Sequence, residues 1–324
     1  MTAIPGAAAL RARRTRTRSL ASTGTDGARF WLAAGPALAV FAVFTIVPMA
    51  SVVYYSFTDY SGFVGVPKFV GLDNYARIFS GDKHILGALG HTLVYSFFYV
   101  VVQIAIAFLL AVLLERAIRG AAFYRAAFFL PVVISSVAVA YTWSFMYDPN
   151  SGTINGVLRG LGLGSLAHDW LGDYNLALLS VIVVDLWRNI GYSIVIFIAG
   201  LGTIPAEVVE AARIDGAGPI AMLRRITIPL MTPTFGLVTV LAVNGALRAF
   251  DTVYLMTGGG PGNQTELYMT LAFDKAFSNR QFGLSSAMSI LVVLVLIPVA
   301  ILQSRLGRDD RPARRSRRVV AGVR

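Results

Sequence analysis

Long apolar stretches alternate with short polar segments along most of this chain, and six of them are long enough to cross a membrane. A helix needs about 20 apolar residues to span the hydrocarbon core of a bilayer. The stretches are Phe30–Phe57, Ile85–Leu114, Ala126–Tyr147, Tyr174–Ala206, Ile226–Thr265, whose helix we expect to end near Met256, and Gln281–Ser304. They predict an all-α polytopic membrane protein with six transmembrane helices. Prolines at 36, 48, 131 and 298 lie in or beside these stretches and predict kinks.

Basic residues gather in alternate connecting segments. Of the 28 Lys and Arg residues, 20 lie in residues 1–29, 115–125, 207–225 and 305–324, and 6 lie in the segments on the other side. Because Lys and Arg in short loops resist translocation, both termini are predicted to be cytoplasmic. Residues 1–29 and 307–324 show little apolar pattern, so we expect them to be disordered basic tails on either side of a transmembrane domain, residues 30–306.

Composition supports the membrane assignment and excludes several kinds of site. Apolar residues make up 56% of the chain, charged residues 14%, and the net charge is +11. We interpret the positive charge as a topology signal and a contact to anionic lipid headgroups, with no role for nucleic acid. There is no cysteine, and His84, His91 and His168 are scattered, so we expect no metal site. No set of residues is placed for catalysis, and we expect no enzyme activity.

Two predicted spans carry polar side chains at helical spacing. Ionisable groups at membrane depth are costly, so they mark candidate solute paths. The fourth span places Asp185, Arg188, Asn189 and Tyr192 on one face, and the fifth does the same with Asn244, Arg248 and Asp251. These stripes suit a cavity for a hydroxylated or phosphorylated solute. Alternatively, each acid and base, three residues apart, neutralise one another and lock helices together.

The segment between the fourth and fifth spans, at about residues 203–229, is short and predicted to be cytoplasmic. It contains Glu210-Ala211-Ala212, and Gly216 and Gly218 permit a chain reversal. Pro219 fits the first turn of a following helix. We therefore predict two short helices around a glycine turn, forming a compact amphipathic hairpin suited to docking a partner.

At this hairpin the chain resembles the permease subunits of binding-protein-dependent ABC importers. The family pattern is Glu-Ala-Ala, three residues, Gly, nine residues, Ile, any residue, Leu-Pro. Here Glu210, Gly216, Ile226 and Pro229 stand at that spacing, and only Ile228 departs, in place of Leu. Further likeness to maltose-type and glycerol-phosphate-type sugar permeases lies in residues 55–59, 69–75, 128–131, 250–254 and 257–262. The resemblance covers roughly residues 30–306.

This resemblance implies a type I importer permease fold in the bacterial inner membrane. It implies four kinds of partner: a second homologous permease, two ATP-binding subunits, an extracytoplasmic solute-binding protein and a small sugar or polyol phosphate. It also implies alternating access, with a coupling role for Glu210, Ala211, Ala212, Asp215 and Gly216. The pattern leaves the identity of the solute open.

ATP is expected to bind the partner subunits only, because a P-loop ends in Gly-Lys and this chain has no Gly-Lys pair. The alternative function is an ion-gradient-driven secondary transporter in which Asp185 or Asp251 relays a proton or sodium ion.

Overall fold

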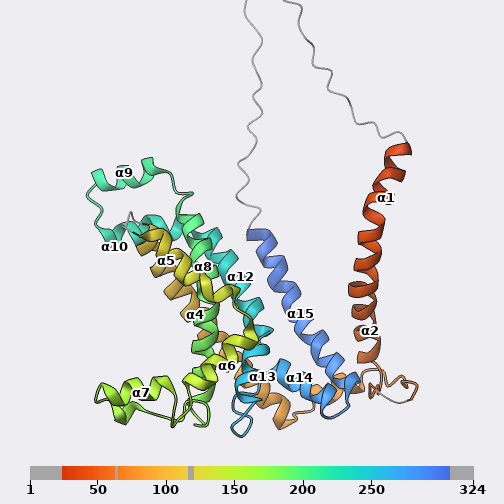
Figure 1. The fold of residues 1–324 in the computed structure, drawn as a ribbon. Coiled ribbons are helices and arrows are strands. Elements are labelled where there is room, and N and C mark those ends of the chain that lie inside the picture. The colour runs from red at the N-terminus through yellow and green to blue at the C-terminus, as the bar shows by residue number, and fades with distance from the viewer. Residues whose placement is uncertain (1–23, 63–64, 116–119, 307–324) are drawn as a thin grey trace, which may run out of the picture. The chain divides into compact units, whose positions relative to one another are not determined.

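The computed structural model describes residues 24–62, 65–115 and 120–306 (Figure 1). The two basic tails predicted at the ends therefore lie outside the described residues, apart from residues 24–29, which belong to α1. The helices before the hairpin are α1 (Gly24–Phe41), η1 (Ala42–Ile46), α2 (Val47–Ser56), α3 (Asp73–Phe79), α4 (Lys83–Glu115), α5 (Ala121–Val133), α6 (Ser136–Met146), α7 (Thr153–Gly160), η2 (Gly164–Leu166) and α8 (Ala177–Leu201). The remainder are α9 (Ala206–Ile214), α10 (Pro219–Met222), η3 (Leu223–Thr227), α11 (Ile228–Leu230), α12 (Thr232–Leu247), α13 (Asp251–Thr257), α14 (Tyr268–Phe277) and α15 (Phe282–Leu306).

The chain divides into two compact units, Met1–Ser51 and Val52–Arg324. In the first, α1, the π-helical turn η1 and the start of α2 form one apolar rod. Pro48 lies two residues after the end of η1, whose wider turn fits the missing proline N–H. None of the most apolar stretch of Ala34–Ser56 is buried.

The second unit is built around α4 and α8. Helices α4, α5 and α12 all pack against α8, and Figure 1 shows them running side by side. Small residues allow this close approach: Ala107 and Ala111 of α4 are fully buried. At Gly191 of α8, an added Cβ would lie 2.1 Å from the carbonyl oxygen of Phe128 in α5. The backbones of α5 and α8 therefore touch at this glycine.

Among the described residues, five helices are long and apolar enough to cross a membrane, and a bent pair makes six if it is counted as one span. Four crossings, the first, second, fourth and sixth, match the predicted stretches closely. The fifth ends at Thr257, near the Met256 that was expected, but it is broken between α12 and α13 at residues 248–250.

A kink was predicted at Pro131 in the third crossing, and the structure has a much sharper break there. Helices α5 and α6 meet at a bend of 100°. The break lies at Ile134 and Ser135, whose ψ angles of 138° and 136° are extended, and so falls after Pro131. Packing explains it: α5 lies on α8, whereas α6 packs mainly on α13.

Candidate solute cavity and coupling hairpin

A cavity of about 350 Å³ lies where α4, α8 and the break in the fifth crossing meet. Its walls combine aromatic, hydroxyl, amide and charged groups. The lining residues are Tyr95 and Tyr99 of α4, Asp185, Arg188 and Asn189 of α8, and Gly245, Arg248, Ala249, Phe250, Asp251 and Thr252 around the break. Such a volume falls within the range of small-ligand pockets, roughly 300–1,000 Å³.

The structure brings together five of the seven residues predicted for a solute cavity. Asp185, Arg188, Asn189, Arg248 and Asp251 line it. The other two, Tyr192 and Asn244, do not. Tyr192 lies about 10 Å along the helix axis from Asp185, at 1.5 Å per residue, and is 48% exposed on the surface of α8.

Asp185 is held by hydroxyl groups from two other helices. Its side chain is only 6% exposed. The Tyr95 hydroxyl of α4 donates to Oδ2 at 2.6 Å, and the Thr252 hydroxyl of α13 donates to Oδ1 at 2.6 Å. The carboxylate therefore joins α4, α8 and α13 at the wall of the cavity.

Local charge pairing, the alternative left open by the sequence, is not seen among the described side chains. No ion pair joins Asp185 to Arg188 or Arg248 to Asp251. Asp251 instead accepts a hydrogen bond of 3.1 Å from the Ser136 hydroxyl of α6. The Nε atom of Arg188 is buried and has no hydrogen-bond partner.

Several residues of this site were missed at the sequence level. Tyr95, Tyr99 and Gln103 recur every four residues in an otherwise apolar span, and all three are buried. The Gln103 amide donates to the Ser193 hydroxyl of α8 at 2.8 Å. This polar stripe on α4 was the available signal, because a buried polar side chain requires a partner on a neighbouring helix.

The hairpin after α8 contains the two short helices that were expected, α9 and α10. Gly216 between them has φ of +80°, the left-handed region that favours glycine. Ala211 and Asp215 are exposed, whereas Ala212 is buried against the rest of the chain. Ala212 is thus part of the internal packing of this chain.

Behind this hairpin lies a hollow of about 620 Å³. It is bordered by the ends of α4 and α8, by α9, and by the segment from Ala217 to Thr227. Its charged lining groups are Glu115, Glu210 and Arg213. The predicted coupling residue Glu210 therefore borders the hollow, while Gly216 lies at the exposed turn.

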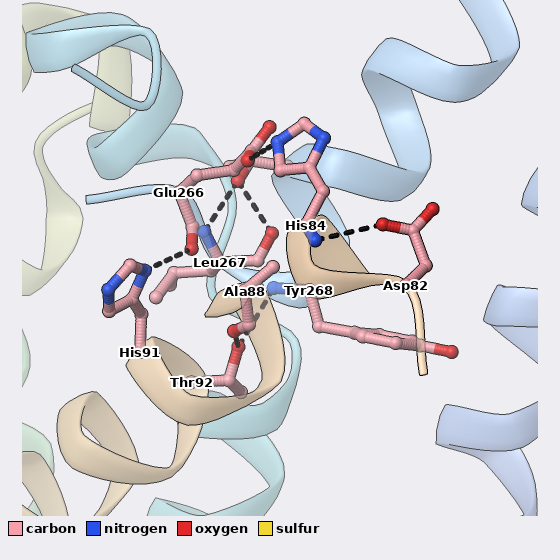
Figure 2. A network of polar contacts seen from close by, with 9 residues as sticks. Asp82, His84, Ala88, His91, Thr92, Glu266, Leu267 and Tyr268 are labelled. Atoms are coloured by element: carbon pink, nitrogen blue, oxygen red, sulfur yellow. Dashed lines mark hydrogen bonds and ion pairs between the residues drawn. The ribbon is translucent and has the colours of Figure 1, made fainter. Parts of the chain in front are cut away.

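A second polar network joins α4 to the segment before α14 (Figure 2). Glu266, 5% exposed, forms an ion pair with His84, and its backbone oxygen lies 3.2 Å from Nδ1 of His91. The Tyr268 amide donates to the Thr92 hydroxyl at 2.8 Å. Burial raises the pKa of the Glu266 carboxyl, and the neighbouring His84 opposes that rise. Two of the three histidines therefore have structural roles, and in the described part of the chain no three metal-ligating side chains gather.

The family model for the binding-protein-dependent transport system inner membrane component matches residues 92–309. The chain is 36% identical to the diacetylchitobiose uptake system permease protein NgcF of Streptomyces coelicolor, covering 97% of this chain and 94% of that protein. It is 34% identical to the multiple sugar-binding transport system permease protein MsmF of Streptococcus mutans, covering 82% and 90%.

The fold is also that of a solved permease. A chain of a bacterial ABC transporter involved in the import of the acidic polysaccharide alginate superimposes with a TM-score of 0.74 at 20% identity, covering 89% of this chain and 99% of that one. With its apolar crossings, the chain is a multi-pass protein of the bacterial inner membrane. It belongs to the binding-protein-dependent transport system inner membrane components, the permease subunits of ABC importers.

Proposed function

We propose that this chain is the permease subunit that carries a carbohydrate or polyol phosphate across the membrane in an ATP-driven importer. The observation that carries the proposal is the cavity between α4, α8 and the broken fifth crossing. Buried Tyr95 and Tyr99 form part of its wall, and its hydroxyl, amide and guanidinium groups offer hydrogen bonds to a hydroxylated solute. The names of the relatives NgcF and MsmF support a saccharide as the solute.

Transport proceeds by alternating access in this proposal. The chain pairs with a second, homologous permease and two ATP-binding subunits, and a solute-binding protein delivers the solute from outside. The permease itself carries out no chemistry and binds no ATP. Family membership supports the dependence on a binding protein, because the family description names it.

The hairpin formed by α9 and α10 is the coupling element in this proposal. Its exposed residues either face an ATP-binding subunit or form the turn that faces it; they are Glu210, Ala211, Asp215 and Gly216. Ala212 holds the hairpin against its own chain. The exposure of Ala211 and Asp215 supports this role. The hollow next to α9 also supports this role, because a helix that transmits a movement needs free space in which to shift.

Uptake in proteoliposomes tests the proposal. The chain is reconstituted with its second permease, its ATP-binding subunits and its solute-binding protein, and uptake of radiolabelled saccharide is measured. We expect uptake with ATP enclosed with the ATP-binding subunits, and none with a non-hydrolysable analogue.

Uptake driven by a proton or sodium gradient without ATP would overturn the proposal. It would favour the secondary transporter in which Asp185 or Asp251 relays an ion. Glu210→Lys provides a further check, since it should lower ATP-driven uptake without lowering the amount of permease in the membrane.

A further inference from the structure

The carboxylates that border the solute cavity already accept hydrogen bonds from hydroxyl groups of the protein. Each oxygen of Asp185 accepts one hydroxyl hydrogen bond, from Thr252 and from Tyr95. Asp251 accepts a hydrogen bond from Ser136 of α6. Hydroxyl groups of the protein therefore supply hydrogen-bond donors to both acids, and neither acid accepts a hydrogen bond from an arginine of the cavity.

The two arginines of the cavity are not satisfied in this way. Arg188 comes from α8, and its buried Nε has no partner. Arg248 comes from the break between α12 and α13, and neither guanidinium takes part in an ion pair with another described residue. A charged group at membrane depth costs several kcal/mol unless it is paired or hydrated. This cost applies to Arg188, whose Nε is buried and without a partner, whereas Arg248 is exposed and adds a second guanidinium at the border of the same cavity. The two groups, from separate elements, point to a ligand that supplies the missing acceptors.

We propose that the cavity selects a solute carrying an anionic group, a carboxylate or a phosphate, on a hydroxylated carbon frame, with Arg188 as its main ligand and Arg248 as the second. A guanidinium presents five N–H donors in a planar fork that matches the paired oxygens of either anion. This inference rests on the proposed function and narrows its substrate class from carbohydrates in general to acidic or phosphorylated ones.

The aromatic side of the cavity is consistent with the carbon frame of such a solute. The Tyr95 and Tyr99 rings stack with centroids 5.7 Å apart and planes at 10°, and Phe250 forms part of the facing wall. Phe250 is only partly buried and offers an apolar ring to the C–H groups of a sugar ring or polyol chain, while the guanidinium groups hold the charged end.

Matched pairs of small molecules test the inference on the purified complex of both permeases and both ATP-binding subunits, without the solute-binding protein. The pairs are galactose with galacturonate and glycerol with glycerol 3-phosphate, and inorganic phosphate is the charge-only probe. Dissociation constants come from isothermal titration. We expect at least one anionic member to bind about tenfold or more tightly than its neutral partner. The pair that shows the difference tells whether the anion is a carboxylate or a phosphate.

Substitutions of the two arginines test whether their guanidinium groups cause the preference for the anionic member of each pair. Arg188→Gln should bring each pair to within about twofold, and Arg248→Gln should reduce the difference partially. Arg188→Lys keeps the charge but loses the fork, so it should retain an intermediate preference, which also controls for misfolding. Arg77→Gln, an exposed arginine of α3 away from the cavity, should behave as the wild type.

Equal binding of neutral and anionic members by the wild type, or a preference that survives Arg188→Gln, would overturn the inference. So would a complex that transports a neutral saccharide and binds none of the anionic probes. In those cases the proposed carbohydrate import still stands. A complete complex that transports no saccharide of either kind would instead overturn the proposed function.

Discussion

Glu266 is a buried carboxyl outside the membrane-spanning segments, and it fixes the segment before α14 to the first turns of α4. His84 contacts its side chain and His91 its backbone. The same segment follows α13, which carries Asp251 and Thr252 into the cavity. A change at Glu266 therefore acts on the segment that follows the C-terminal end of α13, an element that lines the candidate site.

The raised pKa of Glu266 predicts a pH-dependent stability. Because burial is the largest cause of the shift, the folded protein holds this proton to higher pH than the unfolded chain does. Stability is then lost as pH rises from the ordinary value of 4.5 through the folded-state pKa. In thermal unfolding of the detergent-purified protein, Glu266→Gln should gain stability over the wild type as pH rises through this window.

His84→Gln supplies the control for that experiment. The proximity of His84 lowers the pKa of Glu266, so its removal should extend the loss of stability to higher pH. A difference between Glu266→Gln and wild type that stays constant or shrinks with rising pH would contradict the assignment.

The hydroxyl donors of Asp185 give a second prediction at this scale. Thr252→Val keeps the shape of the side chain but leaves one oxygen of a buried carboxylate without its donor. We expect a loss of about 1–3 kcal/mol in the free energy of unfolding. Thr232→Val removes a comparably short hydrogen bond at an exposed position, and should change stability by less than about 0.5 kcal/mol. Equal effects of the two variants would show that Thr252 is not a structural donor.

Helices were predictable here wherever a long uncharged stretch determined them, and a kink was predictable at Pro131, but the 100° size of the bend between α5 and α6 was not. Hydropathy reports that a segment is apolar, but α5 and α6 separate because they pack on different helices, which no local pattern records. The same holds for the cavity. Asp185 and Arg188 stand out by their spacing, but the partners of Asp185 lie 90 and 67 residues away in the chain. Thr252 therefore became visible as a partner of Asp185 only in the fold, and for Tyr95 the sequence offered only the polar stripe on α4.

The contact between α5 and α8 at Gly191 is testable by adding one methyl group. Gly191→Ala would place Cβ 2.1 Å from the Phe128 oxygen, so α5 would have to move. Overpacking of this kind costs about 1–3 kcal/mol. Gly90→Ala on α4 meets no atom within 4 Å, and should be neutral or stabilising by up to about 1 kcal/mol. Unfolding of the two variants in the same detergent compares them, and equal stability would contradict the close approach.

The coupling hairpin offers a similar matched pair. A methyl group added at Gly216 or at Gly218 would meet open space, but only Gly216 has a positive φ, of +80°. Gly216→Ala should therefore strain the turn by about 1–2 kcal/mol and reduce ATP-driven uptake. Gly218→Ala should leave uptake unchanged. If both variants transported like the wild type, the turn geometry would have no part in coupling.

At the scale of the whole molecule, the spans keep much of their apolar surface exposed. Leu93 and Phe97 of α4 are 59% and 62% exposed, and none of the most apolar stretch of Ala34–Ser56 is buried. In water such surfaces would drive aggregation, whereas lipid and neighbouring subunits cover them at no cost. The burial pattern thus agrees with the family assignment, and the charge asymmetry of the loops predicts the direction in which the bundle is inserted.

The direction of insertion can be measured directly by labelling an introduced cysteine. The chain contains no cysteine of its own, so all labelling comes from the introduced residue. Ala211 is exposed on α9, and Leu161, 70% exposed, follows α7 at the opposite end of α8. With cytoplasmic termini, Ala211→Cys should react with a membrane-impermeant maleimide only in inside-out vesicles, and Leu161→Cys only in right-side-out cells. The reverse pattern would place α9 where no cytoplasmic ATP-binding subunit can reach it, and both the coupling role of the hairpin and the direction of transport would have to be abandoned.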